Sequence, residues 1–217
     1  MPAGVSITND FGTILIDTVS PALALKQKMI VATNNQTVPD FSVTNAQTTV
    51  CAIYSPSYIN MQFVSWSGTT KTHGTAIVFG ASGSVSVEFY AFDKPTDSGS
   101  LYGLRLYDEA GNLTFDAVHK YARVVGELTG NGTFAGDSGR KYAGVILGSH
   151  YKDEIIDTGI PGQRRRDVRK THIRSVNNQL IVADQLVSSI TYSSNEAPYV
   201  FAEYGAPHVL VVDVSGY

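Results

Sequence analysis

The densest chemical feature of this sequence is a run of basic side chains in Arg164-Arg165-Arg166-Asp167-Val168-Arg169-Lys170. The planar guanidinium of arginine donates two parallel hydrogen bonds to a carboxylate or a phosphate. We therefore take the basic residues of this run as candidate partner-binding residues for an acidic protein surface or an anionic glycan: Arg164, Arg165, Arg166, Arg169 and Lys170. The alternative is a solubilising loop.

The segment before the basic run contains Pro161-Gly162, a pair that favours a turn. We therefore expect the run to begin on an exposed loop. On such a loop, replacing the three consecutive arginines with serine would change stability by only ~0.5 kcal/mol.

A second chemical candidate is Gly136-Asp137-Ser138-Gly139, which resembles the nucleophile motif of chymotrypsin-like serine proteases. In that family a histidine held by an aspartate activates the serine. The upstream histidines, His73 in Lys-Thr-His-Gly-Thr and His119 in Val-His-Lys-Tyr, lie in different contexts from the histidine of that family. The motif is also ordinary turn composition. We assign no catalytic residue, and a serine hydrolase at Ser138 stays an alternative.

The sequence predicts neither a metal site nor a cofactor. Its five histidines are scattered, and Cys51 is the single cysteine, which excludes an intrachain disulfide and a structural thiolate zinc site. The acidic residues of 153–157 lack the spacing of a calcium loop. A pair of glycosidase carboxylates on different strands has no sequence signature. An enzyme that degrades envelope glycans therefore stays a second alternative.

Composition points to a partner that covers part of the surface. Only 16% of the 217 residues are charged, against about 25% in an ordinary globular chain. We therefore expect a homo-oligomer, with a trimer as the guessed symmetry. A net charge of −3 gives no indication of nucleic-acid binding. The apolar runs are far shorter than the ~20 residues of a membrane helix, and the start Met-Pro-Ala-Gly-Val lacks the basic and apolar regions of a signal peptide. We expect synthesis in a cytoplasm and no membrane insertion.

The strongest structural signal is a repeat. Residues Gly4–Asp17 and Gly103–Asp116 align without a gap, so that Gly12 falls on Gly111 and Asp17 on Asp116. Each copy alternates apolar and polar residues on both sides of a turn with acidic residues and a glycine, which predicts a β-hairpin. A fainter third copy covers Ile173–Val182, with Asn177-Asn178 as its turn.

Strand patterns dominate the rest of the chain. Ser84–Phe92 alternates as a half-buried strand does, and Val209–Val214 is nearly unbroken in apolar residues, which suits a strand buried on both faces. No segment has a convincing helical stripe. We predict an all-β fold of two related antiparallel β-sandwich-like modules, 1–94 and 100–217, with a boundary in Lys94–Ser100. Alternatively, the two modules share one core.

Three segments together carry a resemblance: the opening Met-Pro-Ala-Gly-Val, the second hairpin Tyr-Gly-Leu-Arg-Leu-Tyr-Asp-Glu-Ala-Gly-Asn-Leu-Thr-Phe-Asp, and the closing Val-Leu-Val-Val-Asp-Val-Ser-Gly-Tyr. They resemble short, largely uncharacterised proteins encoded in the tail modules of tailed bacteriophages. The resemblance implies a virion component of the tail tip, baseplate or tail fibre. It implies other tail proteins as partners and, for fibre-associated members, a host-surface glycan or protein receptor. A stand-alone carbohydrate-binding module is the remaining alternative.

Overall fold

The computed structural model describes residues 6–8, 14–17, 22–33, 38–61, 64–73, 76–79 and 84–217, with the backbone alone for 6–8, 14–17 and 76–79. Within these ranges every regular element is a strand and every strand pair is antiparallel. The predicted all-β class is confirmed.

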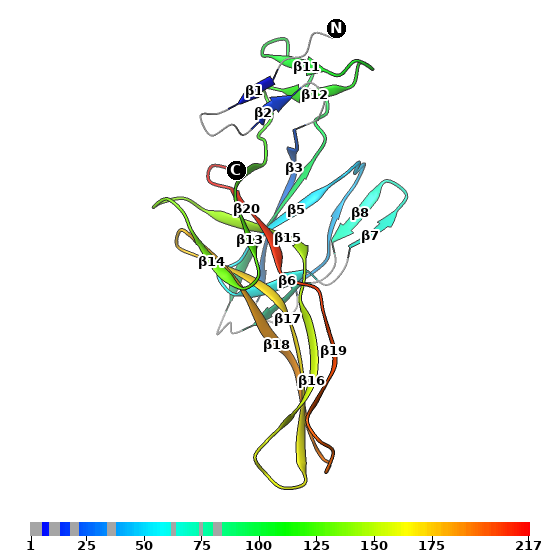
Figure 1. The fold of residues 1–217 in the computed structure, drawn as a ribbon. Coiled ribbons are helices and arrows are strands. Elements are labelled where there is room, and N and C mark those ends of the chain that lie inside the picture. Colours follow the sequence, from blue (N-terminus) through cyan, green and yellow to red (C-terminus); the bar gives the residue numbers. More distant parts are fainter. Residues whose placement is uncertain are drawn as a thin grey trace.

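Figure 1 shows a small head at one end, a body in the middle and a long, narrow arm at the other end. The strands are β1 (Ser6–Thr8), β2 (Ile14–Asp17), β3 (Ala24–Thr33), β4 (Phe41–Val43), β5 (Val50–Tyr54), β6 (Tyr58–Met61), β7 (Val64–Ser67), β8 (Thr70–His73), β9 (Ala76–Phe79), β10 (Val85–Asp93), β11 (Arg105–Tyr107), β12 (Leu113–Asp116), β13 (Arg123–Thr129), β14 (Gly132–Ala135), β15 (Tyr142–Gly148), β16 (Tyr151–Asp157), β17 (Gln163–Val176), β18 (Gln179–Ser193), β19 (Tyr199–Tyr204) and β20 (His208–Asp213).

The body is built on a six-stranded sheet with the order β13-β20-β15-β5-β10-β3. One face of this sheet packs against the seven-stranded sheet that continues into the arm, with Phe89 and Ile173 in one buried cluster. The other face carries a second cluster that includes Tyr90 and Val212. Both faces of the sheet are therefore covered by apolar side chains.

Because both faces of the sheet are covered, β20 and β10 are buried on both sides. Residues 209–213 of the apolar run Val209–Val214 lie in β20, between β13 and β15, and all of them except half-buried Leu210 are buried, as predicted for a strand buried on both faces. The prediction of a half-buried strand at Ser84–Phe92 is wrong for most of its length, because Glu88 and Tyr90 are buried too. Lys141 and Lys28 lie 2.6 and 3.3 Å from the Glu88 carboxylate and compensate its charge.

The six-stranded sheet joins the two halves of the sequence. Strands β3, β5 and β10 precede Lys94, whereas β13, β15 and β20 follow Ser100. The boundary in Lys94–Ser100 therefore does not separate two sheets, and the body has the arrangement of one shared core. The segment instead leads out of the body to the head.

The head contains the repeated hairpins, β1–β2 and β11–β12. Their registers are equivalent: Ile7 pairs with Ile16 as Leu106 pairs with Phe115, and both hairpins have an irregularity at the next residue. Gly111 lies in the turn of the second hairpin with φ 82°, a conformation that glycine adopts readily. The hairpin prediction is confirmed for the backbone, whereas Gly12 lies outside the described residues.

The arm consists of β16, β19 and the outer parts of β17 and β18, over residues 151–170 and 185–204. Strand β17 pairs with β18 along its whole length, from Gln163 opposite Ser193 to Val176 opposite Gln179. The third predicted hairpin is the inner end of this pair, and Asn177 takes φ 54° in its turn. Strand β17 thus begins in the arm and ends in the body core.

We predict that Ile173→Ala lowers the free energy of unfolding by about 2–5 kcal/mol, because it opens a cavity where the two sheets of the body meet. Ile190→Ala, on the exposed arm end of β18, should change it by only ~0.5 kcal/mol. Urea titration followed by circular dichroism measures both. A separate transition for the arm-bearing sheet in the Ile173 variant would contradict a shared core.

Candidate functional site

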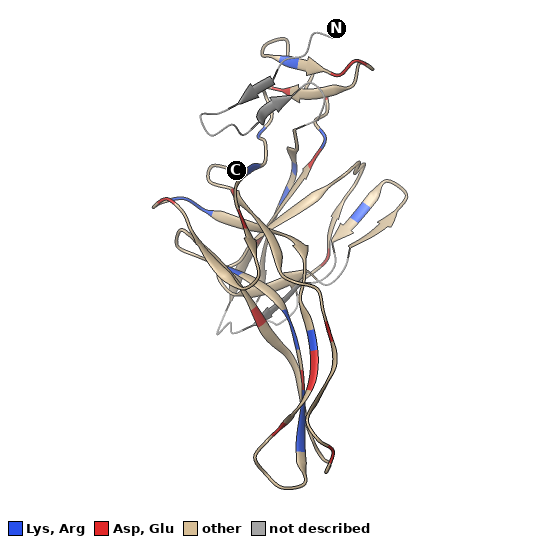
Figure 2. Cartoon of the chain, viewed as in Figure 1, with Lys and Arg blue, Asp and Glu red and all other residues tan. Residues whose placement is uncertain are grey.

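The basic run lies on a strand and not on a loop. The turn that contains Pro161-Gly162 is complete before Gln163, where β17 begins, so all five candidate residues are in β17. The prediction of an exposed loop is wrong because cross-strand pairing with β16 and β18 extends through the whole run. Figure 2 shows bands of basic and acidic residues along the arm.

Two of the arginines form fork-shaped contacts with buried carboxylates. Arg165 donates from Nε and Nη2 to Asp167 at 2.9 Å each, and Arg166 donates from the same two nitrogens to Asp153 at 2.9 and 2.6 Å. The side chains of Asp167 and Asp153 are 0% and 6% exposed. Such paired hydrogen bonds between full charges are among the stronger polar contacts in proteins.

The other three basic residues also have partners within the arm. Arg164 Nε donates to the carbonyl oxygen of Glu196 at 2.6 Å, and Arg169 lies 3.9 Å from both Glu154 and Asp167. Lys170 Nζ lies 5.8 Å from the ring centroid of Tyr151. The run therefore compensates the acidic side chains of its own arm, and binding of an acidic partner stays a prediction.

These contacts lower the pKa values of the two buried carboxylates. The hydrogen bonds from Arg166 hold the pKa of Asp153 below its usual range. Burial raises the pKa of Asp167, but hydrogen bonds from Arg165 and Ser189 outweigh burial and leave that pKa below its usual range as well. Replacing the three consecutive arginines would remove the fork-shaped contacts of the buried Asp153 and Asp167 carboxylates, so the expectation of unchanged stability no longer holds.

Ser138 lies in an exposed turn between β14 and β15. A Cβ on Gly136 would lie 2.2 Å from the ring of Tyr142, and the Asp137 amide donates to the hydroxyl of Tyr142 at 2.9 Å. Gly139 takes φ 78°. Packing against Tyr142 and the turn geometry thus account for both glycines of the protease-like string. Among the described contacts of Ser138 there is none with a histidine.

The histidines lie apart in the fold. His73 is buried against Phe41, and His150 lies between Asp184 and Glu203 at 2.9 and 3.3 Å. In the described part of the chain, no three His, Cys, Asp or Glu side chains are placed to hold a metal ion. Cys51 is a buried free thiol.

The described residues contain no helix that is long and apolar enough to cross a membrane.

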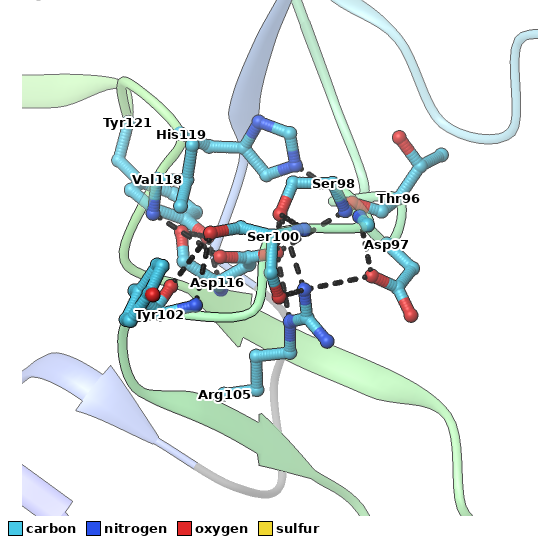
Figure 3. Close-up of polar contacts among 11 residues, drawn as sticks. Thr96, Asp97, Ser98, Ser100, Tyr102, Arg105, Asp116, Val118, His119 and Tyr121 are labelled. Atoms are coloured by element: carbon cyan, nitrogen blue, oxygen red, sulfur yellow. Dashed lines mark hydrogen bonds and ion pairs between the residues drawn. The ribbon is translucent and has the colours of Figure 1, made fainter.

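A polar network in the head holds the loop Ser98–Gly103, which we call the head loop (Figure 3). At its centre is Asp116, the last residue of β12, which is 0% exposed. Its carboxylate accepts hydrogen bonds from Ser98 Oγ at 2.6 Å, from Arg105 Nε at 3.3 Å and from the Val118 amide at 3.1 Å. The Asp116 carboxylate thereby ties the head loop to the second hairpin.

Further hydrogen bonds within the head loop fix its shape. Ser100 Oγ donates to the carbonyl oxygen of Tyr102 at 2.8 Å and accepts from the Tyr102 amide at 3.1 Å, while Arg105 Nη2 donates to the Ser100 carbonyl oxygen. The loop presents Leu101 and Tyr102 with 91% and 85% of their surfaces exposed. Two large apolar side chains are thus held in water on a loop with a defined shape.

The hydrogen bond from Ser98 has the largest effect on the pKa of Asp116. It lowers the pKa of Asp116 to about 2, with smaller contributions from the Val118 amide and the Arg105 charge, whereas burial acts in the opposite direction. The carboxyl is therefore ionised over the whole physiological pH range.

Sequence reasoning missed the head loop. Lys94–Ser100 has the composition of a linker, and Leu101-Tyr102 follows it without any periodic pattern. A large apolar pair directly after a turn-rich segment is the one sequence signal that was available.

Comparison with known proteins adds no family to this picture. No protein-family model matches the chain, and neither the curated proteins nor the solved structures include a match.

We predict that Arg166→Met destabilises the fold at neutral pH, because it leaves Asp153 buried without its charge partner. Combining it with Asp153→Asn should recover part of the loss. Since the folded-state pKa of Asp153 is lowered, the pair stabilises above the ordinary carboxyl pKa and its contribution disappears as pH falls. The difference between wild type and Arg166→Met should therefore shrink in acid. Urea titrations measure this, with exposed Lys94→Met as the control, and equal stabilities at pH 7 would contradict the role of the pair.

We predict that the head loop loosens in acid. Because the pKa of Asp116 is depressed to about 2, its network stabilises fully above about pH 4 and is lost as pH falls toward about 2. Protection of the Ser98 and Val118 amides against hydrogen exchange should fall over this interval. Asp116→Asn should abolish the pH dependence, and Glu109→Gln, in the exposed turn of the same hairpin, should leave it in place. Protection that is constant across the interval in wild type would contradict the assignment.

Proposed function

We propose that this chain is a structural component of a bacteriophage tail, at the tail tip, the baseplate or a fibre, and that the head loop is its contact with a neighbouring protein of the particle. The likeness of both ends and of the second hairpin to tail-module proteins supports the first part of the proposal. The contact is argued from the head loop itself.

The observation that carries the contact is the exposure of Leu101 and Tyr102 on a loop whose shape is already fixed. Leaving two large apolar side chains in water forgoes about 1.5–3 kcal/mol of burial free energy for each. Tyrosine is enriched among the residues that dominate protein interfaces. A loop that the Asp116 network has already ordered loses little conformational entropy on binding. These properties suit a docking element.

Further apolar side chains of the head are exposed. Leu104, Tyr107 and Val118 are 49%, 46% and 54% exposed. An interface centred on the head loop would therefore have an apolar core with the polar groups of the hairpin turns around it, as protein interfaces do. A homo-oligomer, with a trimer as the guessed symmetry, would place a second copy of the chain at this position. A different tail protein would fill the same role.

The test uses particles of the phage that encodes this chain, purified and mapped by peptide mass spectrometry. Peptides of the chain should be present at a fixed ratio to other tail proteins. The double variant Leu101→Ser, Tyr102→Ser, supplied in place of the wild-type chain, should be incorporated at least tenfold less, since the loss of one hot-spot side chain of about 2 kcal/mol, such as Tyr102, already weakens binding by more than tenfold. Its folding should be unchanged because both side chains are exposed.

The matched control is Leu147→Ser, which removes an apolar side chain that is 53% exposed at the end of β15 in the body. This variant should enter particles as the wild type does. Particles that lack the chain would refute the proposed function. Full incorporation of the double variant would refute the head loop as the contact and leave the particle assignment in place.

A further inference from the structure

The register of the arm places four side chains in one row across its four strands. Ile155 of β16 lies opposite Tyr199 of β19 and opposite Arg166 of β17, and Arg166 lies opposite Ile190 of β18. Residues that are directly opposite in an antiparallel sheet point to the same face. The face that carries this row is therefore apolar and aromatic around one arginine.

Phe201 of β19 adds a second ring to this face, next to an irregularity in the strand. Val200 pairs with Glu154 and Ala202 with Asp153, so Phe201 is the extra residue. Its ring lies 4.7 Å from the ring of Tyr199, with an angle of 56° between the planes, and 4.9 Å from the guanidinium carbon of Arg166. Phe201 therefore lies on the same face as Tyr199, as expected for residues two apart in a strand, and its ring extends the row.

These side chains enclose an open groove of about 310 Å³, and its lining includes Ile155, Arg166, Ile190, Tyr192, Tyr199 and Phe201. Ile155 forms a buried floor at 4% exposure, whereas Tyr199 and Phe201 are 42% and 52% exposed. The groove therefore offers apolar ring surfaces that water can reach, with polar atoms between them.

The polar groups of the groove favour an uncharged ligand. Arg166 is held by Asp153 through Nε and Nη2, so its charge is compensated, and among the described residues no acceptor takes its Nη1 hydrogens. Glu196 also lines the groove, and no described side chain donates a hydrogen bond to its carboxylate. The site thus holds a fixed donor, an anionic acceptor and the tyrosine hydroxyls. An anionic ligand would meet the charge of Glu196, whereas the guanidinium groups of Arg164 and Arg166 are already paired with Asp157 and Asp153.

We propose that this groove binds a neutral saccharide. A sugar ring has an apolar C–H face that can lie on Tyr199 or Phe201, and its hydroxyl groups both donate and accept. Arg166 Nη1 would donate a hydrogen bond to a hydroxyl oxygen, and the Glu196 carboxylate would accept a hydrogen bond from a hydroxyl group. Concave sites of this type, mainly apolar with a few placed polar groups, are typical of small-ligand pockets. The inference stands on the groove alone and applies whether or not the chain is part of a particle.

The experiment screens the purified full-length chain against an array of neutral oligosaccharides built from hexoses, deoxyhexoses and N-acetylhexosamines, beside their sialylated and sulfated counterparts. Calorimetry with the best neutral oligosaccharide then gives the affinity. We expect binding to neutral members and weaker binding to the acidic counterparts. Phe201→Ala should weaken binding about tenfold, since a stacked ring contributes up to ~1.5 kcal/mol beyond its buried area.

Two further variants separate this site from the rest of the arm. Tyr204→Ala removes another exposed ring of β19 that stacks on Tyr151 outside the groove, and it should bind as the wild type does. Glu196→Gln should reduce the discrimination against acidic glycans. Failure of every neutral oligosaccharide to bind, a preference for acidic glycans, or binding that Phe201→Ala leaves unchanged would overturn the proposal. So would a result in which Phe201→Ala alters only self-association measured by sedimentation, since the face would then be a protein contact.

Discussion

The continuous pairing of β17 with β18 is the interaction on which the arrangement of the molecule depends. The inner end of β17 contributes Ile173 to the core between the two body sheets, and its outer end carries the arginines of the arm. No loop interrupts the two strands between these environments, because every residue of β17 has a partner on β18. The direction in which the arm leaves the body is therefore set by the core, and the groove on the arm has a fixed position relative to it.

Where β17 and β18 extend beyond the body, they no longer pack against its apolar core. Two sets of contacts stabilise the arm in place of that burial. On one face, Arg166 fixes the Asp153 carboxylate and lies against Phe201. On the other face, Arg165 and Ser189 satisfy Asp167, which is fully buried. Exposed ion pairs contribute little to folding stability. The contacts of a buried carboxylate must remain complete, because the loss of one partner leaves a buried charge uncompensated. The head uses the same principle at Asp116, where the buried carboxylate fixes a loop instead of a strand.

Local patterns in the sequence were sufficient for the hairpins. The alternation around Gly111 and the Asn177-Asn178 turn are short-range signals, and the structure has hairpins at both positions. The apolar run Val209–Val214 likewise predicted its own burial. Features that depend on distant residues were not predicted. The acidic partners of the basic run include Asp153, on a different strand, and the ring that packs against Tyr90 is that of Tyr217, the last residue of the sequence. The support of the head loop by Asp116 joins residues on either side of the second hairpin, and no local pattern encodes it.

The head and the arm lie at opposite ends of the molecule and differ in chemistry: the head loop offers apolar side chains on an ordered backbone, and the arm groove offers rings around a charge-compensated arginine. This division suits a component that is anchored at one end and reaches outward with the other. A cryo-electron microscopy map of the intact particle tests this claim most directly. The account predicts density for the chain in the tail, with Leu101 and Tyr102 covered by a neighbouring protein or copy and the arm directed toward solvent. A tail fully accounted for by other proteins, or a chain placed with its head loop in solvent, would contradict it.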